Sequence, residues 1–339
     1  MHHTHSFTLI RRISQIGLIC FLASRSLSWA QMPPALVNAE RAKILEGVKS
    51  VPKLGAPGPV GIWGQIAFPI LSAPDKDGVE IAVGAAAAHG KGRIILFGQN
   101  SYLNGGGGGD HAKLIENCVK WAGNKAKPRV GVKGVRGLVG IEAKEFDTVE
   151  KKNLTDFDVV IMNTQGIVGA EEGAALIDYI KGGGGFIGGM TGWAYGQTSG
   201  GKDLAISHGV NQALMVAGVA NTDMSAFDQL RSFEARVELP AMMNASDAVT
   251  AIKKQREGGP ALTPEQMKQG MNAIQIAMAA QPPDRSNLKN AVAAALGNAG
   301  SDAPIPTSKA PLNDTQHAAA RLRLGMETRM LRLMSADGI

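Results

Sequence analysis

Apolar residues recur in two alternating patterns along residues 35–233. Short apolar runs, typical of strands buried on both faces, alternate with longer segments whose apolar residues repeat every three or four positions, typical of amphipathic helices. A glycine turn at His89–Gly92 predicts a β-hairpin. Strands are expected at 67–71, 80–88, 93–98, 129–132, 157–162 and 186–189, and helices at 35–49, 110–123, 171–181 and 207–218. This alternation predicts an α/β domain with a flavodoxin-like, mostly parallel sheet and helices on both faces.

The pattern changes after Phe233. The last 106 residues contain no Phe, Tyr or Trp, and their apolar positions have helical spacing. Thr263-Pro264-Glu265-Gln266 has the residues of a helix start, with Thr as N-cap, Pro first and Gln third. Helices are expected at about 242–256, 264–280, 287–296 and 315–334. We therefore predict an α/β domain at 31–233, an α-helical appendage at 234–300, and a linker with a terminal amphipathic helix at 301–339.

Residues 1–30 have the composition of a secretory signal peptide. Arg11 and Arg12 precede an apolar stretch at Ile13–Ala23, and Ser28-Trp29-Ala30 places small residues where cleavage would occur. The stretch is too short to span a bilayer, so no integral membrane segment is expected after cleavage. These features predict an extracytoplasmic protein, periplasmic or secreted. The alternative is an amphipathic N-terminus that is not cleaved.

Charge adds little to this picture. The formal net charge is +6, and residues 1–30 contain three arginines and no acids, so the remainder has 32 basic and 29 acidic residues. Lys and Arg do not form a block with interleaved aromatic residues, so nucleic-acid binding is not expected. Cys118 is the one cysteine beyond the signal, and its place on the apolar side of a helix predicts a core residue.

Ten of the twenty residues from Gly182 to Gly201 are glycine. Within this stretch, Met190–Gly201 follows the strand at 186–189, where the carboxyl edge of a parallel sheet opens into the usual ligand crevice. A class I amidotransferase or an α/β-hydrolase needs a Cys or Ser at that turn. Thr191 is the only hydroxyl residue directly after the strand, and it is more simply a turn residue. We therefore predict no catalytic residue.

Other polar and aromatic residues on this rim could bind a ligand. Trp193 and Tyr195 could stack on a sugar or peptide, or they could cap the sheet edge. His208 lies at the edge of the expected crevice, where a binding role and a structural role are both open. The predicted ligand-binding residues are Gln99, Asn100, Tyr102, Thr191, Trp193, Tyr195 and His208.

The remaining motifs exclude more than they support. His89 and His111 are expected at solvent-exposed turns, and the histidines have no metal-ligand spacing, so neither a metal site nor a cofactor is predicted. The pentaglycine Gly105–Gly109, ahead of a helix with Asp110 as N-cap, could bind an anion or form a flexible rim loop. Gly-Lys-Ser/Thr does not follow it, which excludes a P-loop.

Five ordered segments together resemble one family: AFPIL (67–71), AAAAHGKGRIILFGQNSYL (85–103), LIENCVKWAG (114–123), DYIKGGGGFIGGMTGWAYG (178–196) and HGVNQALMVAGV (208–219). The chain is similar there to the N-terminal amidotransferase-like domain of TRPM8 channel-associated factors and of bacterial proteins with an M60-like (enhancin-type) metallopeptidase domain. The resemblance covers about residues 35–300. It implies a class I amidotransferase-like domain that lacks its catalytic triad.

This chain departs from the family pattern at two places on the rim. Gly98-Gln99-Asn100 stands where members often have Gly-His-Glu, and Gly189-Met190-Thr191 stands where they often have Gly-Gly-Gln. Both departures weaken a catalytic interpretation. A peptidase domain commonly follows this module in the family, and the sequence stops at Ile339, about where that domain would begin.

Three functions remain open from the sequence. The first is an exported, non-catalytic module that binds an unknown glycan, peptide or protein partner at the rim formed by Gly98–Asp110 and Met190–Gly201. The second is a hydrolase, as the N-terminal part of an M60-like metallopeptidase whose catalytic domain is absent from this chain. The third is a scaffold whose helical tail holds a partner.

Overall fold

The computed structural model describes residues 32–166, 169–226 and 230–282, which belong to one compact unit. The signal peptide predicted at 1–30, the helices predicted at 287–296 and 315–334, and the predicted linker lie outside the described residues. The strands are β1 (Ser50–Pro52), β2 (Val60–Ile62), β3 (Ala67–Pro74), β4 (Glu80–His89), β5 (Gly92–Phe97), β6 (Val130–Lys133), β7 (Ala143–Glu145), β8 (Val159–Asn163), β9 (Gly185–Gly189), β10 (Val219–Asn221) and β11 (Ser232–Glu234). The α-helices are α1 (Pro34–Ile44), α2 (His111–Gly123), α3 (Lys151–Leu154), α4 (Ala170–Gly182), α5 (Tyr195–Thr198), α6 (Leu204–Ser207), α7 (Gly209–Leu214), α8 (Ala245–Arg256) and α9 (Pro264–Ala279).

The main sheet has seven strands in the order β3-β4-β5-β9-β8-β6-β7. The pairs from β5 through β9, β8 and β6 to β7 are all parallel, whereas β3, β4 and β5 form an antiparallel meander. The predicted α/β fold with a mostly parallel sheet is therefore confirmed. The hairpin predicted at His89–Gly92 is also confirmed, because β4 and β5 pair up to these two residues.

The strand order departs from a simple flavodoxin series. Counting β6 as the first strand, the run β7-β6-β8-β9 follows the 2-1-3-4 part of the flavodoxin order. The next position is held by β5, which precedes β6 in the chain instead of following β9. The carboxyl edge of the sheet therefore combines residues from two distant parts of the sequence.

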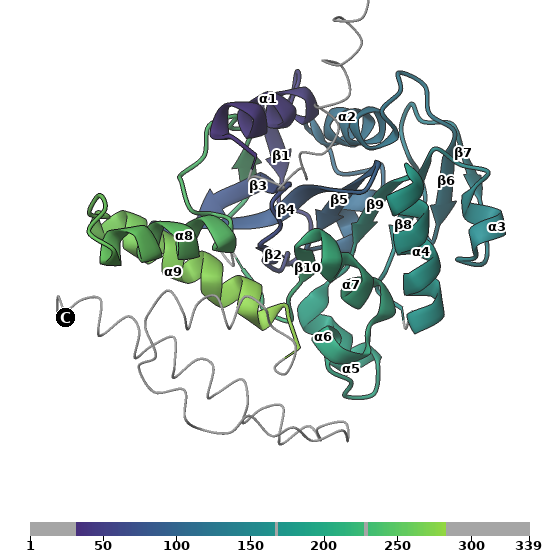
Figure 1. The fold of residues 1–339 in the computed structure, drawn as a ribbon. Coiled ribbons are helices and arrows are strands. Elements are labelled where there is room, and N and C mark those ends of the chain that lie inside the picture. Colours follow the sequence, from purple (N-terminus) through teal and green to yellow (C-terminus); the bar gives the residue numbers. More distant parts are fainter. Residues whose placement is uncertain (1–31, 167–168, 227–229, 283–339) are drawn as a thin grey trace, which may run out of the picture. The chain divides into compact units, whose positions relative to one another are not determined.

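Alternate residues of the central strands build two separate cores. Ile95 and Phe97 of β5 pack with α1 and α2 on one face, whereas Ile94 and Leu96 pack with α4 and α7 on the other. Figure 1 shows these two helical layers on opposite sides of the sheet. The apolar runs of the sequence thus correspond to strands that are buried on both faces.

The outer edge of β3 is covered by side chains from other elements. Arg41 of α1 donates through Nε to the Pro69 carbonyl at 2.7 Å, and Arg236 donates to the Ser72 carbonyl at 3.4 Å. Asn244 donates through Nδ2 to the Ala67 carbonyl at 3.0 Å. These bonds satisfy an edge that would otherwise be a template for pairing with another chain.

The helices predicted at 242–256 and 264–280 are present as α8 and α9. The predicted helix start at Thr263 is confirmed and forms a capping box: Thr263 accepts from the Gln266 amide at 3.2 Å, and Gln266 Oε1 accepts from the Thr263 amide at 2.9 Å. The two helices share an apolar cluster that includes Met242 and partly buried Trp63. α9 packs closely on β2, where a Cβ on Gly61 would lie 2.8 Å from the Ala280 side chain.

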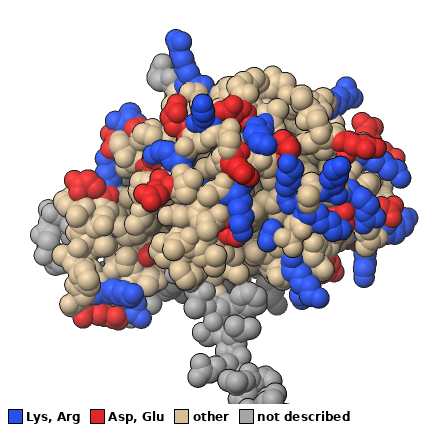
Figure 2. Space-filling model, turned by 90° about the horizontal axis from the view of Figure 1, so that it is seen from above, with Lys and Arg blue, Asp and Glu red and all other residues tan. Residues whose placement is uncertain are grey.

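The surface carries charges of both signs. Figure 2 shows Lys and Arg side chains gathered on the right-hand side of the face seen from above, with acidic side chains between them. Two acids each pair with two cations: Glu116 with Lys113 and Lys120, and Asp158 with Lys125 and Arg129. Exposed pairs of this kind add little stability. In the described part of the chain, none of the helices has the length and apolar character of a membrane span.

Candidate functional site

Three neighbouring parallel strands, β5, β9 and β8, end at the same edge of the sheet, and the residues that follow them meet there. Gly98–Asn100 follow β5, Met190–Trp193 follow β9, and Thr164–Gln165 follow β8. This arrangement brings the predicted residues Gln99 and Thr191 together. The carboxyl edge is where open α/β sheets bind ligands.

Thr191 lies at the centre of a polar group at this edge. Its hydroxyl donates to Gln99 Oε1 at 2.6 Å and lies 3.3 Å from Asn100 Oδ1. Gln165 pairs with the Thr191 backbone: Oε1 accepts from the amide at 2.6 Å, and Nε2 donates to the carbonyl at 3.3 Å. Gln99, Asn100, Gln165 and Thr191 are called the edge cluster below. It joins three amides and one hydroxyl, which form hydrogen bonds without carrying charge.

Gln165 was not among the residues predicted from the sequence. It could have been found from the sequence, because it follows the strand predicted at 157–162 much as Gln99 follows the strand predicted at 93–98. The missing information was the strand order, because only the pairing of β8 with β9 brings Gln165 beside Thr191.

Trp193 is half-buried and is held by the chain itself. Its indole Nε1 donates to the Ala56 carbonyl at 2.9 Å, and Gln99 Nε2 lies 3.5 Å from the same oxygen. Glycine is required nearby for close approach: a Cβ on Gly98 would lie 1.9 Å from the Gly58 carbonyl oxygen. Part of the predicted crevice is thus filled by the segment that precedes β2.

Tyr102 faces the core and not the rim. Its ring is fully buried and stacks on Phe97 with a centroid distance of 5.4 Å. Its hydroxyl accepts from the Leu54 amide at 3.3 Å and lies 3.4 Å from the Pro52 carbonyl. Burial raises the pKa of Tyr102 well above its ordinary value. We do not retain Tyr102 in the candidate site.

Tyr195 and His208 are also fully buried, and their rings meet edge to face at 5.2 Å. His208 Nδ1 accepts from the Asn211 amide at 3.0 Å, which makes His208 the N-cap of α7. Nδ1 is therefore unprotonated, and Nε2 donates to the Thr164 carbonyl at 2.7 Å. Both ring nitrogens are engaged, so the role of His208 in this structure is structural. The predicted stacking role of Tyr195 is not retained either.

The neutral state of His208 gives a testable pH dependence. Burial is the largest influence and lowers the pKa of His208 below its ordinary value of 6.5, against the opposing bond to the Thr164 carbonyl. The unfolded state therefore binds more protons, and the stability that His208 provides is lost as the pH falls below 6.5. We expect His208→Asn, which keeps a capping oxygen, to lose less thermal stability than the wild type between pH 8 and pH 5. An unchanged pH profile in the variant would contradict this role.

Two other sequence expectations are corrected. His111 was expected at a solvent-exposed turn, but it is fully buried, and its Nε2 lies 2.8 Å from the Tyr102 carbonyl. Its ring closes the core beneath the glycine loop, where a Cβ on Gly107 would lie 2.5 Å from Nδ1. Asp110 occupies the N-cap position of α2, but its carboxylate accepts from the Lys49 and Ser50 amides instead of capping that helix. Cys118 is a fully buried core residue, as predicted.

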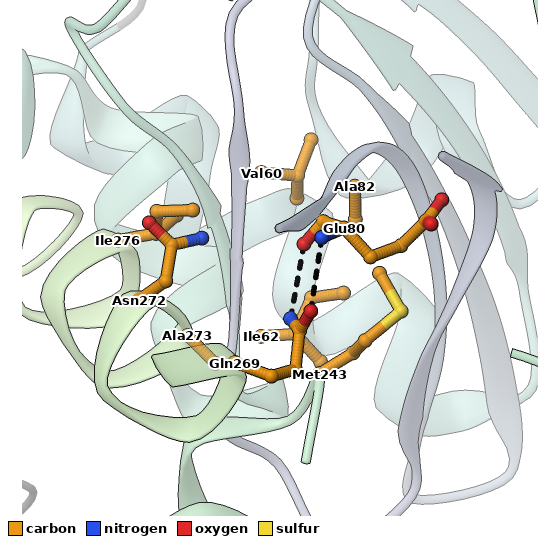
Figure 3. Close-up of a pocket in the computed structure, with 9 residues that line it drawn as sticks. All are labelled: Val60, Ile62, Glu80, Ala82, Met243, Gln269, Asn272, Ala273 and Ile276. Carbon is orange, nitrogen blue, oxygen red and sulfur yellow. Dashed lines mark hydrogen bonds between the residues drawn. The ribbon is translucent and has the colours of Figure 1, made fainter. Parts of the chain in front are cut away.

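A separate pocket lies between α9, β2 and β4, and it shares no residue with the edge cluster. Its cavity volume is about 10 Å³, which is roughly the space of one water molecule and too little for a ligand. Figure 3 shows Gln269 beside the backbone of Glu80, with which it makes two hydrogen bonds of 2.9 and 3.0 Å. The Asn272 side chain also lines the pocket, and its buried Nδ2 has no hydrogen-bond partner in the described structure.

Replacing Asn272 with Leu is expected to stabilise the protein. The change removes an unsatisfied donor and fills apolar space beside Val60 and Ile276, so we expect a gain of about 1 kcal/mol in the free energy of unfolding. Chemical denaturation measures it. Asn272→Ala is the control, because it removes the donor but enlarges the pocket. Equal stability of the two variants would show that the space itself contributes nothing.

Comparison with known proteins places this fold in a family. The profile of the TCAF_N family, described as "TRPM8, N-terminal domain", matches residues 24–235, which is more than half of the chain. The chain belongs to this family. The matched region extends from the last residues of the predicted signal peptide to two residues beyond the predicted α/β domain.

Two curated relatives support the same assignment. The TRPM8 channel-associated factor homolog of Xenopus laevis is 25% identical over 159 residues, which cover 47% of this chain and 17% of that protein. TRPM8 channel-associated factor 2 of Bos taurus is 28% identical over 189 residues, 53% of this chain and 19% of that protein. The chain thus spans less than a fifth of the length of these relatives.

The fold is also similar to a much longer solved protein. The structure of IMPa from Pseudomonas aeruginosa in complex with an O-glycopeptide superposes with a TM-score of 0.53 and 14% sequence identity. The match covers 85% of this chain and 36% of IMPa. At this identity the likeness concerns the fold alone.

The prediction of an extracytoplasmic location is wrong. It depended on residues 1–30, which lie outside the described residues. The matched relatives are factors associated with the TRPM8 channel, and this family membership points away from a periplasmic or secreted protein. The prediction rested on an apolar segment that follows two arginines. An amphipathic N-terminus that is not cleaved can have the same composition. The family match also includes residues 24–30 of the predicted signal.

Proposed function

We propose that this chain is a non-catalytic, amidotransferase-like module that binds a glycan or peptide at the carboxyl edge of its sheet. The observation that carries the proposal is the edge cluster. Asn100 and Gln165 are half-buried there, and half-buried Trp193 follows Thr191 by two residues. Amides that converge next to an aromatic ring suit the hydroxyl and amide groups of a neutral polar ligand.

The contacts of Thr191 favour binding over catalysis. Thr191 holds the position after β9 where a nucleophile would be expected, but its hydroxyl donates to Gln99 Oε1 at 2.6 Å. An amide oxygen is too weak a base to activate a hydroxyl. The nearby His208 uses both ring nitrogens for backbone bonds, so it is not placed as the base.

Calorimetric titration with an O-glycosylated peptide tests the proposal. We choose this probe because the similar IMPa structure contains an O-glycopeptide. We expect binding by the wild type and binding about fivefold weaker for Asn100→Ala and for Trp193→Ala, since each removes one contact worth about 1 kcal/mol. Asn153→Ala on α3, whose side chain bonds only locally to Thr148, is the matched control. Equal binding by all four proteins would reject the edge as the site.

A hydrolase remains the second candidate, as the N-terminal part of an M60-like metallopeptidase. The likeness to IMPa, which other solved structures describe as a metallopeptidase, motivates it. In the described residues, no three His, Cys, Asp or Glu side chains gather as they would around a metal ion. Mass spectrometry of the same glycopeptide, incubated with the purified chain and Zn²⁺, separates the two candidates. Cleavage would favour the hydrolase, whereas binding without cleavage supports our proposal.

The names of the relatives add a protein partner to the candidates. The curated proteins are associated with the TRPM8 channel, and a polypeptide segment of a partner could present the same amide groups as a free peptide. The peptide ligand that we propose could therefore be a segment of a protein partner.

A further inference from the structure

The segment Ala56–Pro59 lies on the carboxyl edge as a peptide ligand would. Gly58 donates its amide to the Gly98 carbonyl at 2.8 Å, and the Pro57 carbonyl accepts from the Ala226 amide at 3.0 Å. The Pro59 carbonyl accepts from the Thr222 hydroxyl at 2.9 Å. With the Trp193 bond to the Ala56 carbonyl, all four residues of the segment are held through their backbone.

The sequence Ala-Pro-Gly-Pro favours an extended conformation of this segment even without its contacts to the edge. A residue that precedes proline is restricted to extended conformations, which applies to Ala56 and Gly58. Each proline fixes its own φ angle. Extended proline-containing peptides lose little entropy on binding and typically dock in aromatic-lined grooves.

The donors at this edge bind a backbone carbonyl of the segment, that of Ala56, and not one of its side chains. The indole N–H of Trp193 points to the Ala56 oxygen at 2.9 Å, and the Gln99 amide nitrogen approaches the same oxygen at 3.5 Å. Gly98 and Gly192 leave no room for a Cβ, because one would lie about 2 Å from the Gly58 and Thr222 carbonyl oxygens respectively. The two donors and the close contact at Gly98 thus face the extended segment, and Gly192 packs against Thr222, whose hydroxyl bonds the Pro59 carbonyl.

We propose that Ala56–Pro59 is a built-in ligand of this edge, and that the edge accepts an extended, proline-containing peptide that takes its place. This proposal rests on the proposed binding function and specifies the ligand class. The tethered segment competes at an effective concentration of millimolar order or higher. An outside proline-containing peptide that takes the place of Ala56–Pro59 therefore binds well only when the segment is loosened.

The test uses a synthetic peptide with the sequence of residues 54–60, Leu-Gly-Ala-Pro-Gly-Pro-Val, titrated into the full-length chain. Gly58→Ala loosens the segment, because its Cβ would lie 2.7 Å from the Met224 carbonyl oxygen. Gly182→Ala is the matched control, since a Cβ at that position would meet nothing within 4 Å. We expect Gly58→Ala to bind the peptide at least about tenfold more tightly than the wild type or the control. A peptide with both prolines replaced by alanine should bind none of them.

Pro57→Gly is a second loosened variant, which frees the φ angle of the segment and leaves the residues of the edge unchanged. It decides the test if Gly58→Ala does not fold. Trp193→Phe in either background keeps a ring and removes the N–H, so peptide binding should weaken about tenfold. Loosened variants that bind no better than the control, or a Trp193→Phe change without effect, would overturn the proposal.

The glycopeptide titration of the wild type keeps the two proposals apart. If the wild type binds the glycopeptide but no loosened variant binds the proline peptide, the proposed function stands and the built-in ligand is rejected. If the loosened variants bind the proline peptide through Trp193 but no protein binds the glycopeptide, the built-in ligand stands and the glycan arm is rejected.

Discussion

A chain that ends at residue 233 is expected to aggregate, whereas a chain that ends at residue 282 is expected to remain monomeric and to melt cooperatively. The shorter chain loses Arg236 and Asn244, which cover the edge of β3, together with α9, which packs on β2. An uncovered hydrophobic edge strand pairs readily with other chains. The buried surface of α8 and α9 is lost as well, and a domain is stable by only about 5–15 kcal/mol.

Size-exclusion chromatography and thermal melting of the two chains measure this effect. The full-length chain is the reference, and the chain that ends at 282 controls for removal of the residues beyond α9. The comparison also tests the predicted domain boundary at 233, which rests on composition alone. If the shorter chain is monomeric and melts within a few degrees of the longer one, the edge cover is dispensable and that boundary stands.

Asn244→Ala is expected to be the most destabilising of the single substitutions considered. Asn244 caps α8 by accepting from the Ser246 amide at 2.9 Å, and its Nδ2 donates to the carbonyls of Gly64 and Ala67 at 2.8 and 3.0 Å. Alanine loses the cap, which costs about 1 kcal/mol, and removes the donor from the buried Ala67 carbonyl and the part-buried Gly64 carbonyl, which costs about 1 kcal/mol for each. We expect a loss of about 3 kcal/mol in the free energy of unfolding, measured by urea denaturation.

Thr263→Ala provides the matched control for this substitution. Thr263 caps α9 in the same way by accepting from the Gln266 amide, but it is exposed and bonds no carbonyl of the sheet edge in the described structure. Its loss should cost about 1 kcal/mol. Asn244→Asp keeps the capping oxygen and removes the two donated bonds. Its stability should therefore lie closer to that of Asn244→Ala than to that of the wild type. Equal costs for Asn244→Ala and Thr263→Ala would show that the edge cover contributes nothing.

The sequence was informative wherever local chemistry decides the structure. The strands at 93–98, 157–162 and 186–189 are apolar runs between turns, and the Thr263 capping box is a local pattern of four residues. The position of Gln99 and Thr191 at the carboxyl edge followed from their place just after strands. These inferences need only the neighbouring residues.

The sequence was uninformative wherever a distant contact decides the role of a residue. His111 and His208 have polar neighbours in sequence, yet both are fully buried, and the His208 ring bonds the Thr164 carbonyl from a different part of the chain. Tyr102 and Tyr195 were predicted at the rim because they follow strands, but their rings turn inward and join the core. Gln165 bonds Thr191, and Ala56 bonds Trp193. No local pattern reveals the arrangement of strands that brings these residues together.

The position of β5 in the sheet has a consequence for folding during synthesis. β5 pairs with β9, so Arg93 lies opposite Gly185, a partner made more than ninety residues later. Until β9 emerges, the β4–β5 hairpin presents one unpaired edge with Ile94, Ile95, Leu96 and Phe97. Such long-range pairing is slow and leaves apolar edges exposed to aggregation. Newly made chains that stop before Gly185 should therefore require a chaperone, whereas chains that extend past Gly189 can close the sheet.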